Sequence, residues 1–181
     1  MRLFVALLPD DATRAALVAT QDALEPLLEK GRRTAAGNLH LTLAFIGEVD
    51  EDGCRRIEEA FAAVPAEPLT GPLALGSVGT FAKRRSTVVW RGLQEGPALT
   101  CARRLQGRIA RALADAGFPV DERFSPHMTL FRSARIAEGA ALEELELPAA
   151  SWQPAIFHLM LSHRPEGGEL TYTPLAEYPL R

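Results

Sequence analysis

The stretch that decides the fold is Leu39-His40-Leu41-Thr42-Leu43-Ala44-Phe45-Ile46. Apolar and polar residues alternate along it, which is typical of a β-strand with one buried face. The alternation places Leu39, Leu41, Leu43 and Phe45 on one face, and His40, Thr42 and Ala44 on the other. We therefore expect a strand over residues 39–46 that buries its leucines and presents an imidazole beside a hydroxyl.

The pattern His-x-Thr-Leu occurs a second time, in Pro126-His127-Met128-Thr129-Leu130-Phe131-Arg132. Only four histidines are present in the chain, and two of them begin these strings, 87 residues apart. By composition alone the coincidence has odds on the order of one in several thousand. Each motif is predicted to place its histidine and threonine on one strand face, about 6–7 Å apart.

The elements around each motif also recur. In the first half we expect strands at 3–8, 39–46 and 69–81, with helices at 11–28 and 50–64 between them. In the second half we expect strands at 86–92, 126–132 and 152–162, with helices at 97–116 and 137–145 between them, and a last strand at 170–178. An internal duplication, with halves of roughly 1–82 and 83–181, is the simplest explanation. We predict a single α+β domain over residues 1–181. Two pseudo-symmetric lobes of mainly antiparallel sheet, with helices outside, would enclose the active site in a central cleft.

Composition limits the class of protein. The chain has 181 residues, is 47% hydrophobic and carries a net charge of −3, so any contact with nucleic acid must be local, at a cleft. Cys54 and Cys101 form no CxxC pattern, which argues against a disulfide framework and a zinc knuckle. The apolar run 3–8 is too short for a signal peptide, and no stretch could cross a bilayer. We expect a cytoplasmic monomer with no membrane partner.

Two imidazoles and two hydroxyls facing across a cleft suit displacement at phosphorus. A neutral histidine can take a proton from water while a protonated one gives a proton to the leaving oxygen. A cyclic phosphodiester fits, because its leaving ribose hydroxyl needs a proton and its strained ring opens without a metal. His40 and His127 are therefore the predicted catalytic pair, with Thr42 and Thr129 donating to the phosphate oxygens.

No metal or cofactor is expected, because neither motif has the HExxH spacing, clustered cysteines or nearby carboxylates of a zinc site. The threonines could instead be ordinary strand residues. Arg132 is an odd number of residues from His127 and Thr129, so strict alternation turns it away, whereas a bulge would turn it inward to bind phosphate. Phe45 and Phe81 are expected in the core, with base stacking as the alternative. Arg84 and Arg85 could guide an RNA backbone or form a solvated turn.

Several segments resemble the 2H phosphoesterases, and among them the RNA 2′,3′-cyclic phosphodiesterases, which are also named for 2′-5′ RNA ligase activity. They are Arg2-Leu3-Phe4-Val5-Ala6, the two motifs with Asn38-Leu39 and Pro126, Phe45-Ile46-Gly47-Glu48, Gly79-Thr80-Phe81, and Tyr172 with Leu175 and Pro179-Leu180. The resemblance implies hydrolysis of RNA 2′,3′-cyclic phosphate ends to a 2′-phosphate. It also implies that His40 protonates the 3′ oxygen and that His127 activates water.

Other functions stay open at this point. Reverse 2′-5′ ligation would need no ATP, since the chain has no P-loop and neither of its two lysines lies in a nucleotidyl-transfer motif. A phosphodiesterase for a small cyclic nucleotide, or a non-catalytic RNA- or nucleotide-binding module, could share the fold. The presence of both histidines and both threonines argues against the module. Phe131 stands where the resemblance leads us to expect a small residue, and it could narrow the cleft.

Overall fold

The computed structural model describes residues 1–65, 67–83, 86–121 and 123–181, and within them two antiparallel sheets and three α-helices. The His40 lobe is the sheet β3-β1-β8-β9, with β1 Arg2–Leu7, β3 Leu41–Glu48, β8 Ile156–His163 and β9 Thr171–Pro179. The His127 lobe is the sheet β2-β6-β5-β4-β7, with β2 Leu28–Arg33, β4 Leu73–Lys83, β5 Ser86–Leu93, β6 His127–Ile136 and β7 Ser151–Trp152. The α+β prediction is confirmed.

The two sheets share an order that reveals their pseudo-symmetry. Strands β3 and β6 carry the motifs, β1 and β5 lie beside them, and β8 and β4 come next. Strand β4 comes from the first half of the chain and pairs with β5, whereas β8 comes from the second half and pairs with β1. The lobes therefore interleave the segments 1–82 and 83–181, and the duplication itself stays a prediction.

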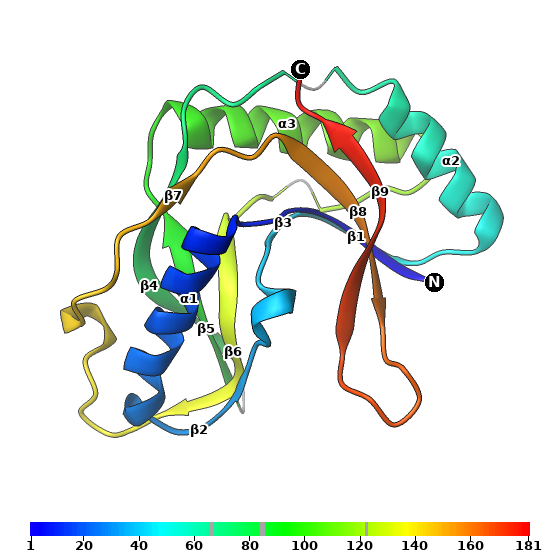
Figure 1. Ribbon diagram of the computed structural model, residues 1–181. Helices are drawn as coiled ribbons and strands as arrows, with labels where there is room; N and C mark the ends of the chain where they lie inside the picture. Colours follow the sequence, from blue (N-terminus) through cyan, green and yellow to red (C-terminus); the bar gives the residue numbers. More distant parts are fainter. Residues whose placement is uncertain (66, 84–85, 122) are drawn as a thin grey trace.

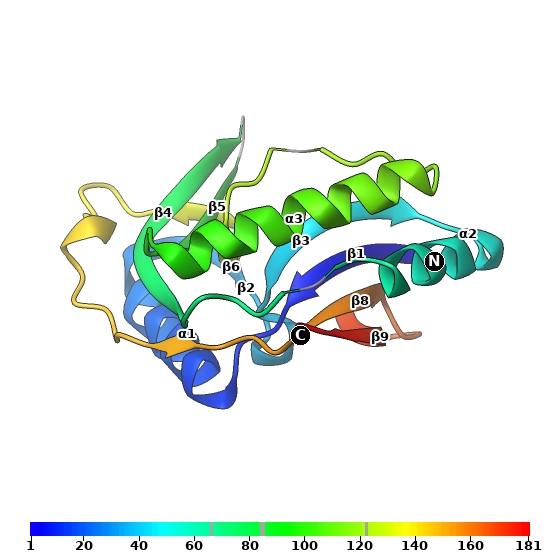
Figure 2. The ribbon, with the colours of Figure 1, turned by 90° about the horizontal axis from the view of Figure 1, so that it is seen from above.

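The helices are exchanged between the lobes in the same way. Helix α1 (Asp11–Leu24) follows β1 but contacts β6, and it covers the sheet of the His127 lobe in Figure 1. Helix α3 (Pro97–Asp115) follows β5 but contacts β3. Helix α2 (Glu51–Ala62) packs against α3 and β9 outside the His40 lobe, as the view from above shows (Figure 2). No helix among the described residues has the length and apolar character to cross a membrane.

Local signals explain where the helices begin. The carboxylate of Asp10 accepts from the backbone amide of Thr13 at 2.8 Å, and that of Asp50 accepts from Gly53 at 2.7 Å, so both side chains cap helices. Pro97 begins α3, a position where its missing amide hydrogen is not needed.

Three sequence predictions about elements were wrong. The first helix ends at Leu24, because Pro26 cannot continue it; a 3₁₀ turn (Glu25–Leu27) and the unpredicted β2 follow. The helix expected over 137–145 is only a 3₁₀ turn at Leu142–Glu144. The strand expected over 152–162 is divided into β7 and β8, and Pro154 lies in the gap.

The core lies between the sheets and the helices. In β1, Leu3, Val5 and Leu7 are fully buried in it, while Phe4 and Ala6 form a separate small cluster with Met160 on the opposite face. Strand β1 therefore has apolar residues on both faces, as a continuous apolar run allows. The second face is the floor of the cleft, because Phe4 lines its cavity with His40.

A β-bulge interrupts each motif strand directly after its threonine. In β3, Thr42 lies opposite Ala6 and Ala44 opposite Val5, so Leu43 is the extra residue. In β6, Thr129 lies opposite Trp90 and Phe131 opposite Val89, so Leu130 is the extra residue. A bulge reverses the alternation of faces beyond it.

The bulges correct one side-chain prediction and decide two that the sequence left open. Phe45 was expected in the core with Leu43, but it turns to the cleft and is 53% exposed, while Ala44 is buried instead. Phe131 is 1% exposed and faces the core, so it does not narrow the cleft. Arg132 turns to the cleft, which is the inward alternative for this residue.

Candidate active site

Both motif histidines are held through the same ring nitrogen. Nδ1 of His40 lies 2.7 Å from the carbonyl oxygen of Asn38, and Nδ1 of His127 lies 2.7 Å from that of Ser125. A carbonyl can only accept, so Nδ1 donates and the neutral imidazole keeps its lone pair on Nε2. Pro126 favours an extended conformation for Ser125, which helps to set this carbonyl. Each lobe thus presents an Nε2 atom that can take or give a proton.

Thr42 completes the arrangement in the His40 lobe. Its hydroxyl oxygen lies 2.9 Å from Nε2 of His40, within hydrogen-bond distance. Because Nδ1 carries the hydrogen, the hydroxyl donates to Nε2 while the imidazole is neutral. Thr129 lies two residues after His127, before the bulge, so both point to the same face of β6, where Thr129 is half-buried opposite Trp90.

A pair of aromatic rings borders each imidazole. The centroid distances to His40 are 4.9 Å for Phe4 and 5.2 Å for Tyr172, and those to His127 are 4.8 Å for Phe81 and 6.1 Å for Trp90. Tyr172 and Phe81 meet their histidines nearly edge-on, at 90° and 88°. The rings restrict how each imidazole can tilt. Phe81, expected in the core, is 37% exposed and belongs to this border.

The electrostatic setting of the two histidines differs. The pKa of His40 is lowered from its usual 6.5 to about 4, mainly by burial and also by the positive charges of Arg132 and His127, against the raising effect of the Asn38 carbonyl. Burial and Arg132 also lower the pKa of His127, which is only half-buried. The charge of His127 thus contributes to the low pKa of His40, and the charge of Arg132 contributes to the low pKa of both histidines.

A cavity of about 290 Å³ lies over the face of β3 that carries His40. It brings together His40, Thr42 and Arg132, the last of which comes from the other lobe. The structure therefore brings predicted residues of both motif strands to one cleft. A larger hollow of about 970 Å³ lies outside, between α2 and α3, and neither motif lines it.

Sequence reasoning gave no role to Arg2 and Tyr172, which also line the cavity. The guanidinium of Arg2 lies 5.1 Å from the ring centroid of Phe45, over its face. The pairing of β1 with β3 would have been needed to find this contact, because Arg2 is far from the motifs in sequence.

Two further predictions are not tested by the structure. Arg84 and Arg85 lie outside the described residues. Within the described ranges no three His, Cys, Asp or Glu side chains are grouped so that they could hold a metal ion, and metal independence stays a prediction.

Two antiparallel sheets that each present a His-x-Thr strand to one cleft define the class of the 2H phosphoesterases. The chain belongs to the 2′-5′ RNA ligase superfamily, whose profile matches residues 9–166. It is 34% identical to the RNA 2′,3′-cyclic phosphodiesterase of Archaeoglobus fulgidus over 142 residues, 75% of this chain and 74% of the relative. It is 32% identical to the Escherichia coli K12 protein of the same name over 155 residues, 84% and 81% of the two chains.

Solved structures agree with this membership. E. coli LigT in its apo form superposes with a TM-score of 0.77 at 28% identity, covering 98% of this chain and 96% of LigT. TT0787 of Thermus thermophilus gives 0.72 at 27% identity, covering 100% and 98%. LigT has also been solved in complexes with 3′-AMP, NADP⁺ and ATP, so this relative binds nucleotides.

Proposed function

We propose that this protein hydrolyses RNA 2′,3′-cyclic phosphate ends to 2′-phosphates, with its two motif histidines as acid and base and without a metal. One observation carries the proposal: both imidazoles are fixed through Nδ1, and Arg132 of the His127 lobe lines the cavity of His40, where its charge lowers the pKa of both histidines. The names of the relatives support RNA as the substrate class.

The reaction follows from the free Nε2 atoms. With the cyclic phosphate between the lobes, neutral His127 takes a proton from water, and the water oxygen forms a bond to phosphorus. The bond from phosphorus to O3′ breaks in line with this attack, and protonated His40 gives its Nε2 proton to O3′. Arg132 and the hydroxyls of Thr42 and Thr129 hold the non-bridging oxygens and their developing charge. Proton exchange with solvent then resets both histidines.

The difference in burial supports these roles. The attacking water must come from solvent, which reaches the half-buried His127 more readily than His40. His40, with a pKa of about 4 in the free protein, is a strong acid once protonated. A bound phosphate anion offsets the charge of Arg132 and raises the pKa of His40, so binding favours the protonated donor.

The exposed ring of Phe45 provides a surface for the base of the terminal nucleotide. Stacking on an aromatic face accepts any base, which suits an enzyme for RNA ends of differing sequence. If the 5′-hydroxyl of a second RNA takes the place of water, the same groups would form a 2′-5′ linkage without ATP.

The test is digestion of a defined oligonucleotide that ends in a 2′,3′-cyclic phosphate. The product is typed by mass and by its sensitivity to a phosphatase and to a nuclease that needs a free 2′-hydroxyl. We expect a 2′-phosphate and a free 3′-hydroxyl. A 3′-phosphate would overturn the role assignment but leave two-histidine chemistry standing. No hydrolysis of any cyclic phosphate would favour the binding module.

A further inference from the structure

The cleft continues past the cavity of His40 into a second, strongly basic cavity. This cavity has a volume of about 220 Å³ and shares Arg132, Leu170 and Tyr172 with the first. Its other lining residues come from β2, the segment after it, and the connection between β8 and β9, and its charged members are Arg32, Arg33, Arg132, Arg164 and Glu169. Four cations and one carboxylate therefore surround a space that opens onto the proposed reaction centre.

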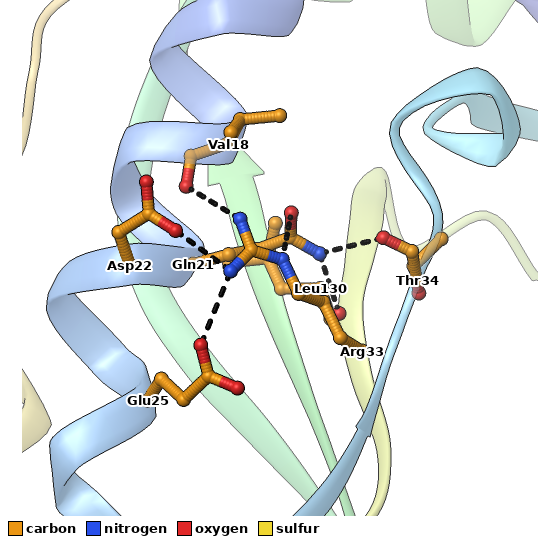
Figure 3. A network of polar contacts seen from close by, with 7 residues as sticks. All are labelled: Val18, Gln21, Asp22, Glu25, Arg33, Thr34 and Leu130. Carbon is orange, nitrogen blue, oxygen red and sulfur yellow. Dashed lines mark hydrogen bonds and ion pairs between the residues drawn. The ribbon is translucent and has the colours of Figure 1, made fainter.

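One of these arginines has its own partners. Arg33 contacts carboxylate oxygens of Asp22 at 2.7 Å and Glu25 at 3.2 Å, and it donates to the side-chain oxygen of Gln21 at 3.2 Å (Figure 3). It lies opposite the buried Phe131, on the side of β2 that α1 covers. Arg33 thus fixes β2 to α1, and its neighbour Arg32 is left on the opposite face.

Arg32 lies directly opposite Arg132 in the β2–β6 pair. Like charges at such positions destabilise a sheet unless something neutralises them. Within the ranges that the structure describes, no ion pair or hydrogen bond of the side chains of Arg32, Arg132 or Arg164 is found. The three cations meet at one cavity whose only carboxylate among the described lining residues is Glu169. This excess charge points to an anionic ligand.

We propose that Arg32 and Arg164 bind the phosphodiester on the 5′ side of the terminal nucleotide, while Arg132 stays with the reacting phosphate. The inference rests on the proposed function and names the part of the RNA that the site reads. Arginine suits this task because its planar guanidinium binds two phosphate oxygens at once. The second cavity makes the enzyme prefer RNA ends to free nucleoside cyclic phosphates.

Matched substrates test the proposal: a nucleoside 2′,3′-cyclic phosphate, the same compound with a 5′-phosphate, and a short RNA with the same terminal nucleotide. In the wild-type protein the 5′-phosphate should lower KM about tenfold, the effect of one charge-assisted contact. Arg32→Gln and Arg164→Gln should each reduce this KM ratio, and the double variant should bring it close to one. The matched control is Arg135→Gln, which removes the same charge from β6 but at a residue ion-paired with Glu29. The control should keep the wild-type ratio.

Salt dependence gives a second measurement. For the short RNA, a plot of log kcat/KM against log salt should lose about 0.7 of its slope per contact removed in Arg32→Gln and Arg164→Gln, and none in Arg135→Gln. Two results would overturn the second site and leave the proposed function intact. One is a wild-type KM ratio of one, and the other is a rise in KM by the same factor for both small substrates in the variants. If no substrate is hydrolysed, the proposed function fails. The second site is then tested by direct titration, in which the Kd ratio of the compounds without and with the 5′-phosphate takes the place of the KM ratio.

Discussion

The two lobes repeat one device in different surroundings. In each, a backbone carbonyl two residues earlier holds Nδ1 of the histidine, two aromatic rings border the imidazole, and a bulge follows the threonine. The bulge brings the fifth residue after each histidine to the cleft. That residue is Phe45 in one lobe and Arg132 in the other, so the scaffold is shared while one lobe offers a ring and the other a cation.

A second contrast lies in the helices behind the motif strands. Gln21 of α1 is fully buried, and its amide nitrogen donates at 2.9 Å to the carbonyls of Thr34 and Leu130, the latter being the bulge residue of β6. Gln106 of α3 is also buried, but its amide nitrogen has no partner among the described residues. The bulge residue of the His127 lobe therefore has a side-chain donor, and among the described residues no side chain donates to its counterpart Leu43 in the His40 lobe.

The largest expected effect comes from removing either imidazole. His40→Ala and His127→Ala should each lower kcat/KM for an RNA cyclic phosphate by about 10²- to 10⁴-fold, because each removes one proton-transfer group of the proposed mechanism. Circular dichroism serves as the fold control. If both variants retained more than about a tenth of the wild-type rate, the two histidines would not be the acid–base pair.

The next largest effect concerns stability in acid, where we expect His40 and His127 to contribute differently to the free energy of unfolding. The pKa of His40 is about 4 in the folded protein and about 6.5 when unfolded, so the neutral form is the one that folding favours. This stability is present above pH 6.5 and is lost as the pH falls from 6.5 to 4, by up to about 3 kcal/mol.

Replacing His40 by a residue that cannot titrate removes this loss. His40→Gln should therefore show a flatter decline in the free energy of unfolding between pH 6.5 and 4, measured by urea titration. His127→Gln should change the decline less, since His127 is less buried. Equal flattening in both variants would show that the lobes bury their histidines alike.

The pH dependence of activity tests the contrast between Arg132 and Phe45. The proposed mechanism needs one neutral and one protonated histidine, and both pKa values are lowered in the free protein. The bell-shaped profile of kcat/KM should therefore peak below pH 6.5. Arg132→Gln removes a positive charge that lowers both pKa values, so the peak should move to higher pH and its height should fall about tenfold or more.

Phe45→Leu provides the matched change in the other lobe. It removes the aromatic face but no charge, so KM should rise by about tenfold while the peak stays at the same pH. The peak of the pH profile should move in Arg132→Gln and stay in Phe45→Leu. The opposite result in either variant would contradict the roles of Arg132 as a charge and Phe45 as a stacking surface.

The smallest effect should come from the glutamines. Gln21→Met leaves the bulge carbonyl of Leu130 without its side-chain donor and should lower the free energy of unfolding by about 1–3 kcal/mol. Gln106→Met removes a buried amide nitrogen that has no partner among the described residues, so it should be neutral or slightly stabilising. Denaturant midpoints of the two variants check this order, and a larger loss for Gln106→Met would reverse it.

Local patterns in the sequence predicted what local physics controls. The two His-x-Thr strands, and the helices that Asp50 caps and Pro97 begins, agree with the structure because alternation, caps and helix period are visible within a few residues. Features that depend on a distant partner were not predictable. The bulges at Leu43 and Leu130 exist only in relation to the neighbouring strand, so the inward turn of Arg132 stayed one of two alternatives.

Strand β2 shows a different limit. Its sequence, Leu28-Glu29-Lys30-Gly31-Arg32-Arg33, is charged and has none of the alternation of a half-buried strand. It forms because β6 pairs with it and because Arg33 fixes it to α1. The second cavity was therefore not predictable from the sequence, because it depends on a strand that the sequence does not indicate.

The exchange of elements between the lobes limits how the molecule can move. Hinged enzymes close over a substrate because only a few residues connect their domains. Here the chain passes from one lobe to the other six times: between β1 and α1, β2 and β3, α2 and β4, β5 and α3, α3 and β6, and β7 and β8. The motif strands β3 and β6 also contact each other. A hinge would have to bend all of these connections at once. We therefore expect the cleft to be a fixed opening, which the substrate of the proposed reaction enters and the product leaves by diffusion. The alignment of the imidazoles would then be set when the chain folds rather than when the substrate arrives.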